Sequence, residues 1–396
     1  MTAVRHVDDD ERRRRLVRRH HLGRTAATCR QAVADVLAMH SSDPLTPFLG
    51  LRARVPDLTI AAIDAALYEE RGLWRLHAMR RTLWIVDRDD APAVLAGSTA
   101  KVAAAERRRL HGWLGALDDH PAAADPAAWL ADLEAAVHAQ LADGPMATRE
   151  LSTTVPGFAT KVTLGTGRWA QEAAIGPRLL FLMAMDGDPV RGAPLGTWRA
   201  SQYVWHAHRQ RFGTDPPTRP STDQAQAQLA RRHLDRFGPV TEEDLAWWMG
   251  WTKAETRRAL SAVSPVEVTT DAGPAWVLPG DDGPEPPLDA PAVALLPGLD
   301  PSTMGWKARD FYLGDHGAAL FDRNGNAGPT IWLDGRVVGG WAQGPDGGVR
   351  TRLLEDVGAD AAALVDAEAA AVGAWIGDDG VTPRFRTPLE RELSGA

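Results

Sequence analysis

Three side chains that can donate or accept a proton or a hydrogen bond lie close together in the sequence near the N-terminus. His40 can donate or accept a proton near neutral pH, because the pKa of an unperturbed imidazole is about 6.5. Ser42 can donate or accept one hydrogen bond, and Asp43 can supply an anion. Alternatively, His40 ends a helix, Ser41 and Ser42 cap the next turn, and Asp43-Pro44 forms a turn.

A second group of candidates carries positive charge or a flat ring, which are the properties that hold phosphates and bases of nucleic acids. They fall in three short stretches: Arg75, Arg80 and Arg81; Trp198, Arg199, Gln202 and Tyr203; and Lys253, Arg257 and Arg258. The alternatives are solvated hairpin charges for the first stretch, packing of Trp198 into a core for the second, and an ordinary surface helix for the third.

The elements expected around the third stretch are typical of a winged helix-turn-helix. A short helix containing Trp247 breaks at Gly250, and a second helix carries Lys253, Arg257 and Arg258 within about two turns. Two β-rich runs, Val266–Thr270 and Ala275–Leu278, follow. A winged helix offers such a second helix to the major groove of DNA.

An internal repeat predicts a second unit of this kind. The segment Gly144-Pro145-Met146-Ala147-Thr148-Arg149-Glu150-Leu151 matches Gly238-Pro239-Val240-Thr241-Glu242-Glu243-Asp244-Leu245 in its Gly-Pro start and its final leucine. The later helix of this second unit is predicted at Gly167–Ile175, with wing strands at Leu179–Met185 and Trp198–Trp205.

A first unit is predicted upstream from helices followed by a hairpin. Its elements are helices at Cys29–His40, Thr46–Arg54 and Thr59–Arg71, and strands at Leu73–His77 and Thr82–Asp87. A helical arm, Pro92–Asp118, follows it. Beyond the linker Gly280–Pro291, the pattern changes to strands, among them a hairpin around Asp334-Gly335, and then to the helix Asp360–Gly377.

The predicted fold is therefore mainly α with β wings (α+β): three tandem winged-helix units plus a C-terminal α+β lid domain. The predicted segments are a basic N-terminal helix (1–24), winged helix 1 with its arm (25–120), winged helix 2 (121–213), winged helix 3 (214–283) and the lid (284–396).

Composition limits the classes of protein that remain. The 396 residues carry a formal net charge of −8, yet residues 1–30 hold nine arginines against four acids, so a local basic face is compatible with the acidic total. No apolar run is long enough to span a membrane, and the charged N-terminus predicts a cytoplasmic protein. The single cysteine, Cys29, argues against cysteine-based metal sites, and no Gly-rich phosphate loop follows a strand, so we expect no cofactor and no metal.

Several motifs together resemble the AlkZ/YcaQ-type tandem winged-helix family, whose characterised members are DNA glycosylases. The resemblance runs from about Leu22 to Gly377 and rests on these segments: Leu37-Ala38-Met39-His40-Ser41-Ser42-Asp43, His77-Ala78-Met79-Arg80-Arg81-Thr82-Leu83, Trp198-Arg199-Ala200-Ser201-Gln202-Tyr203, Phe237-Gly238-Pro239-Val240-Thr241 with Ala246-Trp247-Trp248, Leu295-Leu296-Pro297-Gly298-Leu299-Asp300-Pro301, and Asp334-Gly335-Arg336-Val337-Val338-Gly339.

The resemblance implies excision of N-alkylated purines from double-stranded DNA. The family's catalytic Gln-x-Gln or Gln-x-Asp motif falls on His40-Ser41-Ser42, directly before Asp43, so both catalytic glutamines are replaced. We expect a monomeric, nucleoid-associated glycosylase that acts on bulky or N7-alkylated purines in DNA repair or genotoxin self-resistance, with catalytic roles for His40, Ser42 and Asp43. The alternatives are a non-catalytic DNA-binding regulator or lesion sensor and, less directly, a protein-interaction scaffold.

Overall fold

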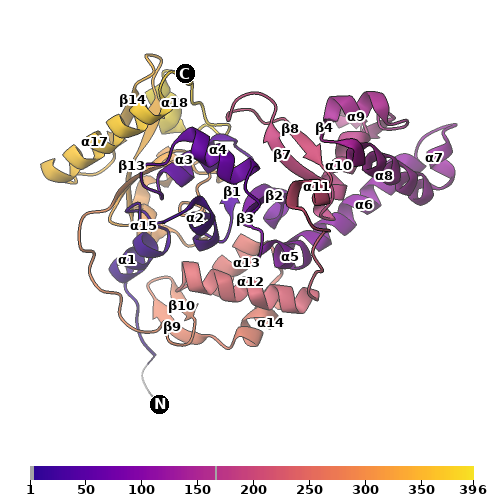
Figure 1. Ribbon diagram of the computed structural model, residues 1–396. Coiled ribbons are helices and arrows are strands. Elements are labelled where there is room, and N and C mark those ends of the chain that lie inside the picture. Colours follow the sequence, from indigo (N-terminus) through magenta and orange to yellow (C-terminus); the bar gives the residue numbers. More distant parts are fainter. Residues whose placement is uncertain (1–3, 166) are drawn as a thin grey trace. The chain divides into compact units, whose positions relative to one another are not determined.

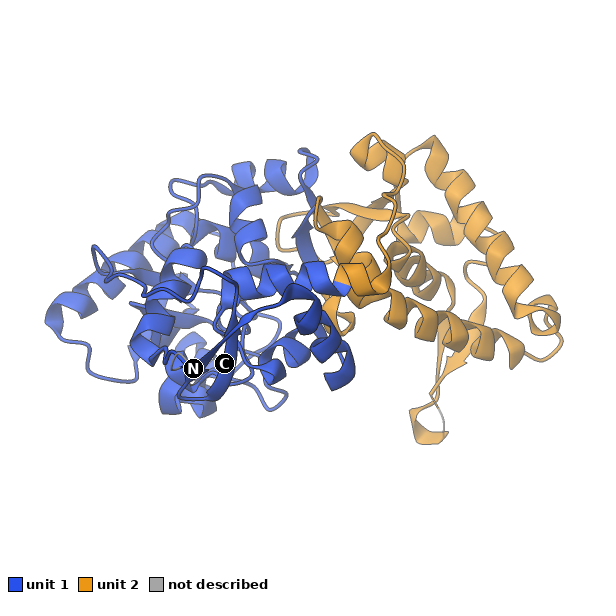
Figure 2. Ribbon diagram, turned by 90° about the horizontal axis from the view of Figure 1, so that it is seen from below, with its two compact units in different colours: residues 1–73, 84–87, 226–396 blue, residues 74–83, 88–225 orange. Residues whose placement is uncertain are grey.

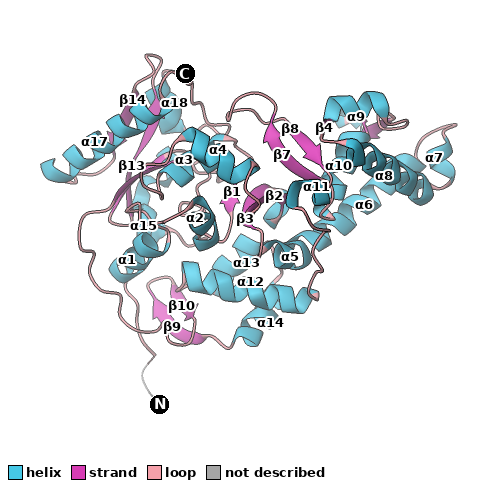
Figure 3. Cartoon of the chain, viewed as in Figure 1, coloured by secondary structure: helices cyan, strands magenta, loops and turns pink. Residues whose placement is uncertain are grey.

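The computed structural model describes residues 4–165 and 167–396, which divide into two compact units. The first unit consists of the chain up to Leu73, Trp84–Asp87 and Gln226–Ala396; the second consists of Trp74–Leu83 and Arg88–Ala225 (Figure 2). Helices alternate with small antiparallel sheets, so the chain is a mixed helix-and-strand protein (Figure 3). These units are larger than the five predicted segments, whose boundaries stay predictions.

The first unit opens with short helices around a two-residue strand (Figure 1). The elements are α1 (Asp9–Arg19), α2 (Cys29–Asp35), β1 (Met39–His40), α3 (Leu45–Arg52) and α4 (Ile60–Tyr68). Strand β1 pairs antiparallel with β3 (Leu83–Asp87), so that His40 lies opposite Trp84. The predicted helix Cys29–His40 was therefore too long: it ends at Asp35, and Leu37 turns the backbone with a φ of 61°.

The short helix, the second helix and the two strands predicted around Gly250 are confirmed in that order, and so is the helix predicted before them at Asp223–Phe237. The elements are α12 (Thr222–Phe237), α13 (Glu242–Met249), α14 (Lys253–Val263), β9 (Val266–Thr270) and β10 (Gly273–Val277). Thr241 and Thr252 cap the second and third helices through capping boxes with acids three residues later. Gly250 ends α13 with a φ of 71°, a left-handed conformation that glycine adopts without a steric penalty.

Both copies of the Gly-Pro repeat lead into a helix through the same kind of contacts, although the Gly238-Pro239 bond is cis and the Gly144-Pro145 bond is not. After Pro145, Ala147 pairs with Val204, and Glu150 Oε2 accepts the N–H of Ala147 at 2.6 Å. After Pro239, Val240 bridges Trp276, and Asp244 Oδ2 accepts the N–H of Thr241 at 3.1 Å. Each segment therefore fixes the start of a helix against a strand far along the chain.

The C-terminal part of the first unit is a four-stranded antiparallel sheet with helices packed on it. The strands, in spatial order, are β11 (Val293–Leu296), β12 (Thr330–Leu333), β13 (Arg336–Gln343) and β14 (Val349–Leu353). The predicted hairpin turn is confirmed, since Asp334 and Gly335 both have positive φ. Helix α17 (Ala359–Ile376) contacts β11 and β14, and α18 (Pro388–Ser394) contacts β13.

A fully buried ion pair links the early helices to this region. The guanidinium of Arg54 donates to both carboxylate oxygens of Asp300, at 2.8 and 2.7 Å, and to Ser302 Oγ at 2.8 Å. A buried pair is costly to break, because removing one partner leaves an uncompensated charge. The pair therefore fixes the position of α3, which follows the His40 segment directly.

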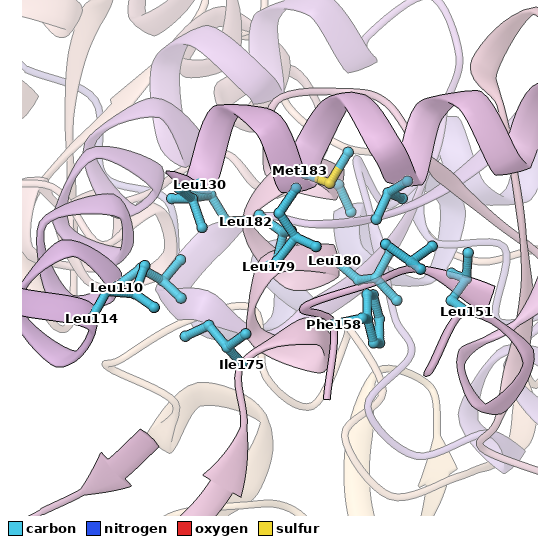
Figure 4. Packing of buried hydrophobic residues seen from close by; sticks show 14 of the residues in the cluster. Leu110, Leu114, Leu130, Leu151, Phe158, Ile175, Leu179, Leu180, Leu182 and Met183 are labelled. Atoms are coloured by element: carbon cyan, nitrogen blue, oxygen red, sulfur yellow. The ribbon is translucent and has the colours of Figure 1, made fainter. Parts of the chain in front are cut away.

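The second unit is organised around one hydrophobic core. Its elements are β2 (Leu73–His77), the short turn η1 (Met79–Arg81), α5 (Ala91–Val94), η2 (Leu95–Thr99), α6 (Ala100–Gly115), α7 (Pro121–Ala124), α8 (Pro126–Asp143), β4 (Met146–Ala147), α9 (Thr148–Thr154), β5 (Lys161–Leu164), η3 (Gly167–Trp169), β6 (Gln171–Ala174), α10 (Gly176–Met185), β7 (Val190–Pro194), β8 (Tyr203–His206) and α11 (His208–Phe212). Leucines of α6, α8 and α10 gather with Phe158 and Ile175 in this core (Figure 4).

Two predictions in this unit were wrong, and a third was too long, since only Tyr203–Trp205 of the predicted strand Trp198–Trp205 lies in β8. The segment predicted as the helix Gly167–Ile175 contains a short 3₁₀ turn and strand β6, which pairs with β5. The run Leu179–Met185, predicted as a strand, lies in helix α10. That helix is buried on nearly every side, so its sequence lacks the polar face that identifies a helix, whereas Pro177 near its start is a helix signal that the prediction missed.

None of the described helices combines the length and the apolar character that crossing a membrane requires.

Candidate functional site

The imidazole of His40 is held in place by its own turn and by an aromatic neighbour. Its side chain is almost entirely buried, at 6% exposure, and its ring meets the ring of Trp84 edge-on at 4.6 Å. The backbone N–H of Ser42 donates to Nδ1 of His40 at 3.3 Å. Because Nδ1 accepts a hydrogen bond, it carries no proton, and in the neutral ring the proton is on Nε2.

Further aromatic rings support Trp84 from behind. Trp84 packs on Trp248 with 5.5 Å between ring centroids, and Trp248 packs on His233 at 5.2 Å. His233 in turn stacks on Phe237 at 4.5 Å with nearly parallel rings. These residues come from β3, α12 and α13. The ring of His40 therefore lies against a rigid aromatic group, and the orientation of the imidazole is limited by packing.

Asp43 is engaged by backbone groups from two parts of the chain. Its Oδ1 accepts the N–H of Leu45 at 3.0 Å, and its Oδ2 accepts the N–H of Arg384 at 2.7 Å. Burial is the main influence on this carboxyl and raises its pKa, although the two N–H bonds and the charge of Arg384 oppose the rise. Asp43 thus braces the turn that carries Ser42.

Arg384 is a residue that the sequence interpretation missed. Besides its backbone bond to Asp43, its Nη1 donates to the carbonyl oxygen of Ser42 at 2.9 Å. The C-terminal segment before α18 therefore lies directly on the His40–Asp43 turn. No local signal in the sequence connects positions 342 residues apart, so only the folded chain reveals this contact.

The predicted DNA-binding residues of the second unit fall into two kinds. Some are arginines that contact neighbouring side chains, and others line a cavity. Arg81 forms an ion pair with Glu106 at 2.9 Å, and Arg80, on the same turn, is half-buried with a φ of 55°. The guanidinium of Arg75 lies 4.4 Å from the ring centre of Tyr203. Tyr203 and Gln202 line a cavity of about 870 Å³, whereas Trp198 is buried and Arg199 is half-buried.

The cationic candidates of the first unit lie on α14 and are all exposed. Arg257 Nε donates to both carboxylate oxygens of Glu242 at 3.0 Å, and Arg258 Nη2 donates to Gln226 Oε1 at 2.9 Å. Thr252 caps the helix beside Lys253. The three charges therefore share one helix, as the sequence predicted, and part of the charge of Arg257 is neutralised within the protein.

The structure brings predicted residues together in three groups: His40, Ser42 and Asp43 on one turn; Lys253, Arg257 and Arg258 on one helix; and Gln202 and Tyr203 in the wall of one cavity, with Arg75 over the ring of Tyr203. Within the described ranges, no group of three or more histidines, cysteines and acids is arranged to hold a metal ion. The described side chains therefore comprise one turn with an imidazole, a hydroxyl and a carboxyl group, one helix with three cations, and one cavity with polar and aromatic side chains in its wall.

Comparison with known proteins places the chain in a family. Residues 33–375 match the sequence model described as DNA glycosylase AlkZ-like, and the chain belongs to this family. The fold is similar to that of the Streptomyces sahachiroi DNA glycosylase AlkZ, with a TM-score of 0.69 and 18% identity, over 92% of this chain and 96% of that one. No curated protein matches the sequence.

Proposed function

We propose that the protein is a monofunctional DNA glycosylase that hydrolyses the N-glycosidic bond of bulky or N7-alkylated purines. The observation that carries this proposal is the family match over residues 33–375, because that range contains the His40-Ser41-Ser42 turn. A DNA glycosylase needs no metal to break this bond when the base is already a good leaving group, and an N7-alkylated purine carries a positive charge that makes it one.

The chemistry asked of the turn is modest. A water molecule must be held near the sugar C1′, and the positive charge that develops on the sugar must be stabilised. The N–H at Nε2 of His40 can donate to that water, and the hydroxyl of Ser42 can donate to it or accept from it. Asp43 holds the turn and places a carboxylate behind it. In this proposal, His40 and Ser42 together take the role of the two glutamines of the family motif, and Asp43 supports them.

Double-stranded DNA is the partner that the cationic groups support. We propose that α12–α14 with β9 and β10 form a winged helix that presents α14 to DNA, and that the Gly-Pro repeat marks a second such unit. Lys253, Arg258 and the residues around the cavity of the second unit would contact phosphates. We further propose that the protein acts as a monomer on alkylated DNA in the nucleoid, in general repair or in self-resistance to a genotoxin.

A second candidate function is a lesion sensor that binds alkylated DNA without cutting the glycosidic bond. One observation favours it: His40 is only 6% exposed. The sequence alignment that we propose, with His40 and Ser42 at the positions of the two motif glutamines, agrees with it. A sensor requires the DNA-binding surfaces but no water at C1′. It is therefore expected to bind damaged duplexes in a salt-sensitive way and to leave no abasic sites.

One assay separates the two candidates. Duplex DNA containing 7-methylguanine is incubated with the protein, abasic sites are cleaved with hot base, and the fragments are resolved on a gel. A glycosylase yields cleaved strands in proportion to time and enzyme. A sensor yields none above the spontaneous loss of the base, although it retains the duplex in a binding assay.

A further inference from the structure

The cavity of about 870 Å³ in the second unit has an arginine in its wall that its own surroundings do not neutralise. Arg191 lies on β7, and its guanidinium stacks on the ring of Trp205, at 4.3 Å from the ring centre. Its Nη1 is 3.2 Å from Nδ1 of His77. An arginine always donates, so Nδ1 of His77 accepts, and this histidine is neutral.

His77 contributes no negative charge to this pair. Burial lowers the pKa of His77 to about 2, and the charges of Arg191 and Arg81 lower it as well. Burial is also the main cause that lowers the pKa of Arg191 to about 9; Tyr203 raises that pKa, and the charge of Arg75 lowers it. The ionisable groups that act on Arg191 are therefore a phenol and a second cation. A partly buried cation in this setting favours an anion from outside.

Other groups in the cavity wall suit the same anion. Arg149 and Gln202 are exposed in the wall. Trp205 Nε1 donates to Thr148 Oγ1 at 3.0 Å, so the hydroxyl proton of Thr148 is available to a further acceptor. The wall contains one acid, Glu150, whose Oε2 accepts the N–H of Ala147 at 2.6 Å. Two arginines against one engaged carboxylate leave the cavity net positive.

We propose that this cavity binds a phosphate group, with Arg191 as its principal ligand and Arg149 as its second, and that the phosphate belongs to the backbone of the DNA substrate. A guanidinium is planar, and its paired N–H groups match the paired oxygens of a phosphodiester; the contact with the Trp205 ring limits where this guanidinium can lie. The phosphate site itself follows from the cavity. Only its assignment to DNA rests on the proposed function.

The test compares three substitutions in the full-length protein. Arg191→Met keeps most of the side-chain volume on Trp205 and removes the charge, and Arg149→Ala removes the second ligand. Arg209→Ala is the matched control, because this arginine of the same unit is exposed and paired with Asp215 at 2.5 Å. Binding of a fluorescein-labelled undamaged duplex is measured by anisotropy over a salt series, and the effect of inorganic phosphate on the Tm is measured for each protein.

We expect Arg191→Met to weaken duplex binding by about tenfold. The slope of log K against log salt should also become shallower by about 0.9, which corresponds to one lost phosphate contact. Arg149→Ala should have a smaller effect in the same direction, and Arg209→Ala should leave both quantities close to wild type. Inorganic phosphate should raise the Tm of the wild type and of Arg209→Ala more than that of Arg191→Met.

Each other result has a definite meaning. If Arg191→Met loses the response to inorganic phosphate but binds the duplex like the wild type, the assignment to DNA is wrong and the site takes a free phosphate compound. If Arg191→Met and Arg209→Ala behave alike in both measurements, the site does not exist. Base excision is scored separately: a wild-type protein that binds the duplex but excises nothing refutes the glycosylase proposal and leaves the phosphate site standing.

Discussion

If His40 stands where the family motif has its first glutamine, as we propose, its imidazole offers fewer hydrogen bonds than that amide. A glutamine amide has two N–H donors and an acceptor oxygen, whereas the neutral ring of His40, with Nδ1 used by the N–H of Ser42, retains one N–H at Nε2. The hydroxyl of Ser42 can supply the missing acceptor. The two residues are therefore expected to act as a pair, and neither alone reproduces the water-binding capacity of the family motif.

At the same scale, Asp43 is predicted to matter for stability because both carboxylate oxygens accept backbone N–H groups. In Asp43→Asn, one of those N–H groups would face an NH₂ donor. The substitution should destabilise the first unit by about 1–3 kcal/mol, the typical cost of a buried donor without an acceptor. Thermal unfolding measures this effect. Asp366→Asn, at an exposed position on α17, is the control and should leave the Tm unchanged.

His233 is predicted to make the protein sensitive to acid. Its ring is fully buried against Phe237, and burial lowers its pKa to about 3. Between its unfolded pKa, near 6.5, and its folded pKa, the unfolded chain binds one more proton, so stability falls as the pH falls through this window. The loss attributable to this residue is about 1.4 kcal/mol for each pH unit below 6.5.

His233→Leu removes that contribution. The Tm of the variant minus the Tm of the wild type should therefore become more positive when the pH is lowered from 7.5 to 5. A Tm difference that is the same at both pH values would show that His233 does not take part in the acid response. The comparison needs no knowledge of the function, because it concerns only the folded and unfolded chains.

On helix α14, the contacts of each cation within the protein predict how much that cation contributes to DNA binding. Arg257 is bound to Glu242 through both carboxylate oxygens at 3.0 Å, whereas the ammonium of Lys253 lies at the exposed start of the helix. A cation already paired with an acid releases fewer ions when a phosphate binds. Lys253→Ala should therefore weaken duplex binding more than Arg257→Ala.

The measurement is anisotropy with an undamaged duplex over a salt series. The loss of Lys253 should make the slope of log K against log salt shallower by about 0.9. The ranking is wrong if Arg257→Ala costs as much affinity as Lys253→Ala. If neither variant changes the affinity, α14 does not face the DNA, and the proposed role of this winged helix is lost.

Elements with local signals were predictable from the sequence. The Asp334-Gly335 turn and the end of a helix at Gly250 depend on residues only a few positions apart, and the structure has both. By contrast, β1 forms because Met39 and His40 pair with Ile85 and Trp84, which are more than 40 residues away. The spacing of apolar residues predicted a helix as far as His40, because this spacing reflects only neighbouring residues and contains no information about a distant strand.

The candidate site shows the same division between local and distant signals. The four consecutive residues from His40 to Asp43 were found because their chemistry is adjacent in the sequence. Arg384 and Arg191 were missed, because the importance of each arises from a partner that folding supplies: the Ser42 carbonyl for one, and Trp205 with His77 for the other. In the sequence alone these contacts cannot be seen, so Arg384 and Arg191 look like any other arginine of this arginine-rich chain.

At the scale of the whole molecule, the net charge of −8 means that attraction to DNA depends on where the cations lie. The DNA contacts that we propose come from α14 in the first unit and from the cavity containing Arg191 and Arg149 in the second. The family match spans both units, from residue 33 to residue 375. We therefore propose that the first unit carries the turn that orients the water molecule and that cations of both units are needed for DNA binding.

The central claim is that the His40–Ser42 turn excises alkylated purines, and base release from 7-methylguanine DNA tests it most directly. Wild type and the double variant His40→Ala/Ser42→Ala are compared by alkaline cleavage of the abasic product, with duplex binding measured in parallel. The account predicts cleavage by the wild type, and at least about a hundredfold slower cleavage by a double variant that still binds the duplex. Equal rates for the two proteins, or no cleavage by either, would contradict it.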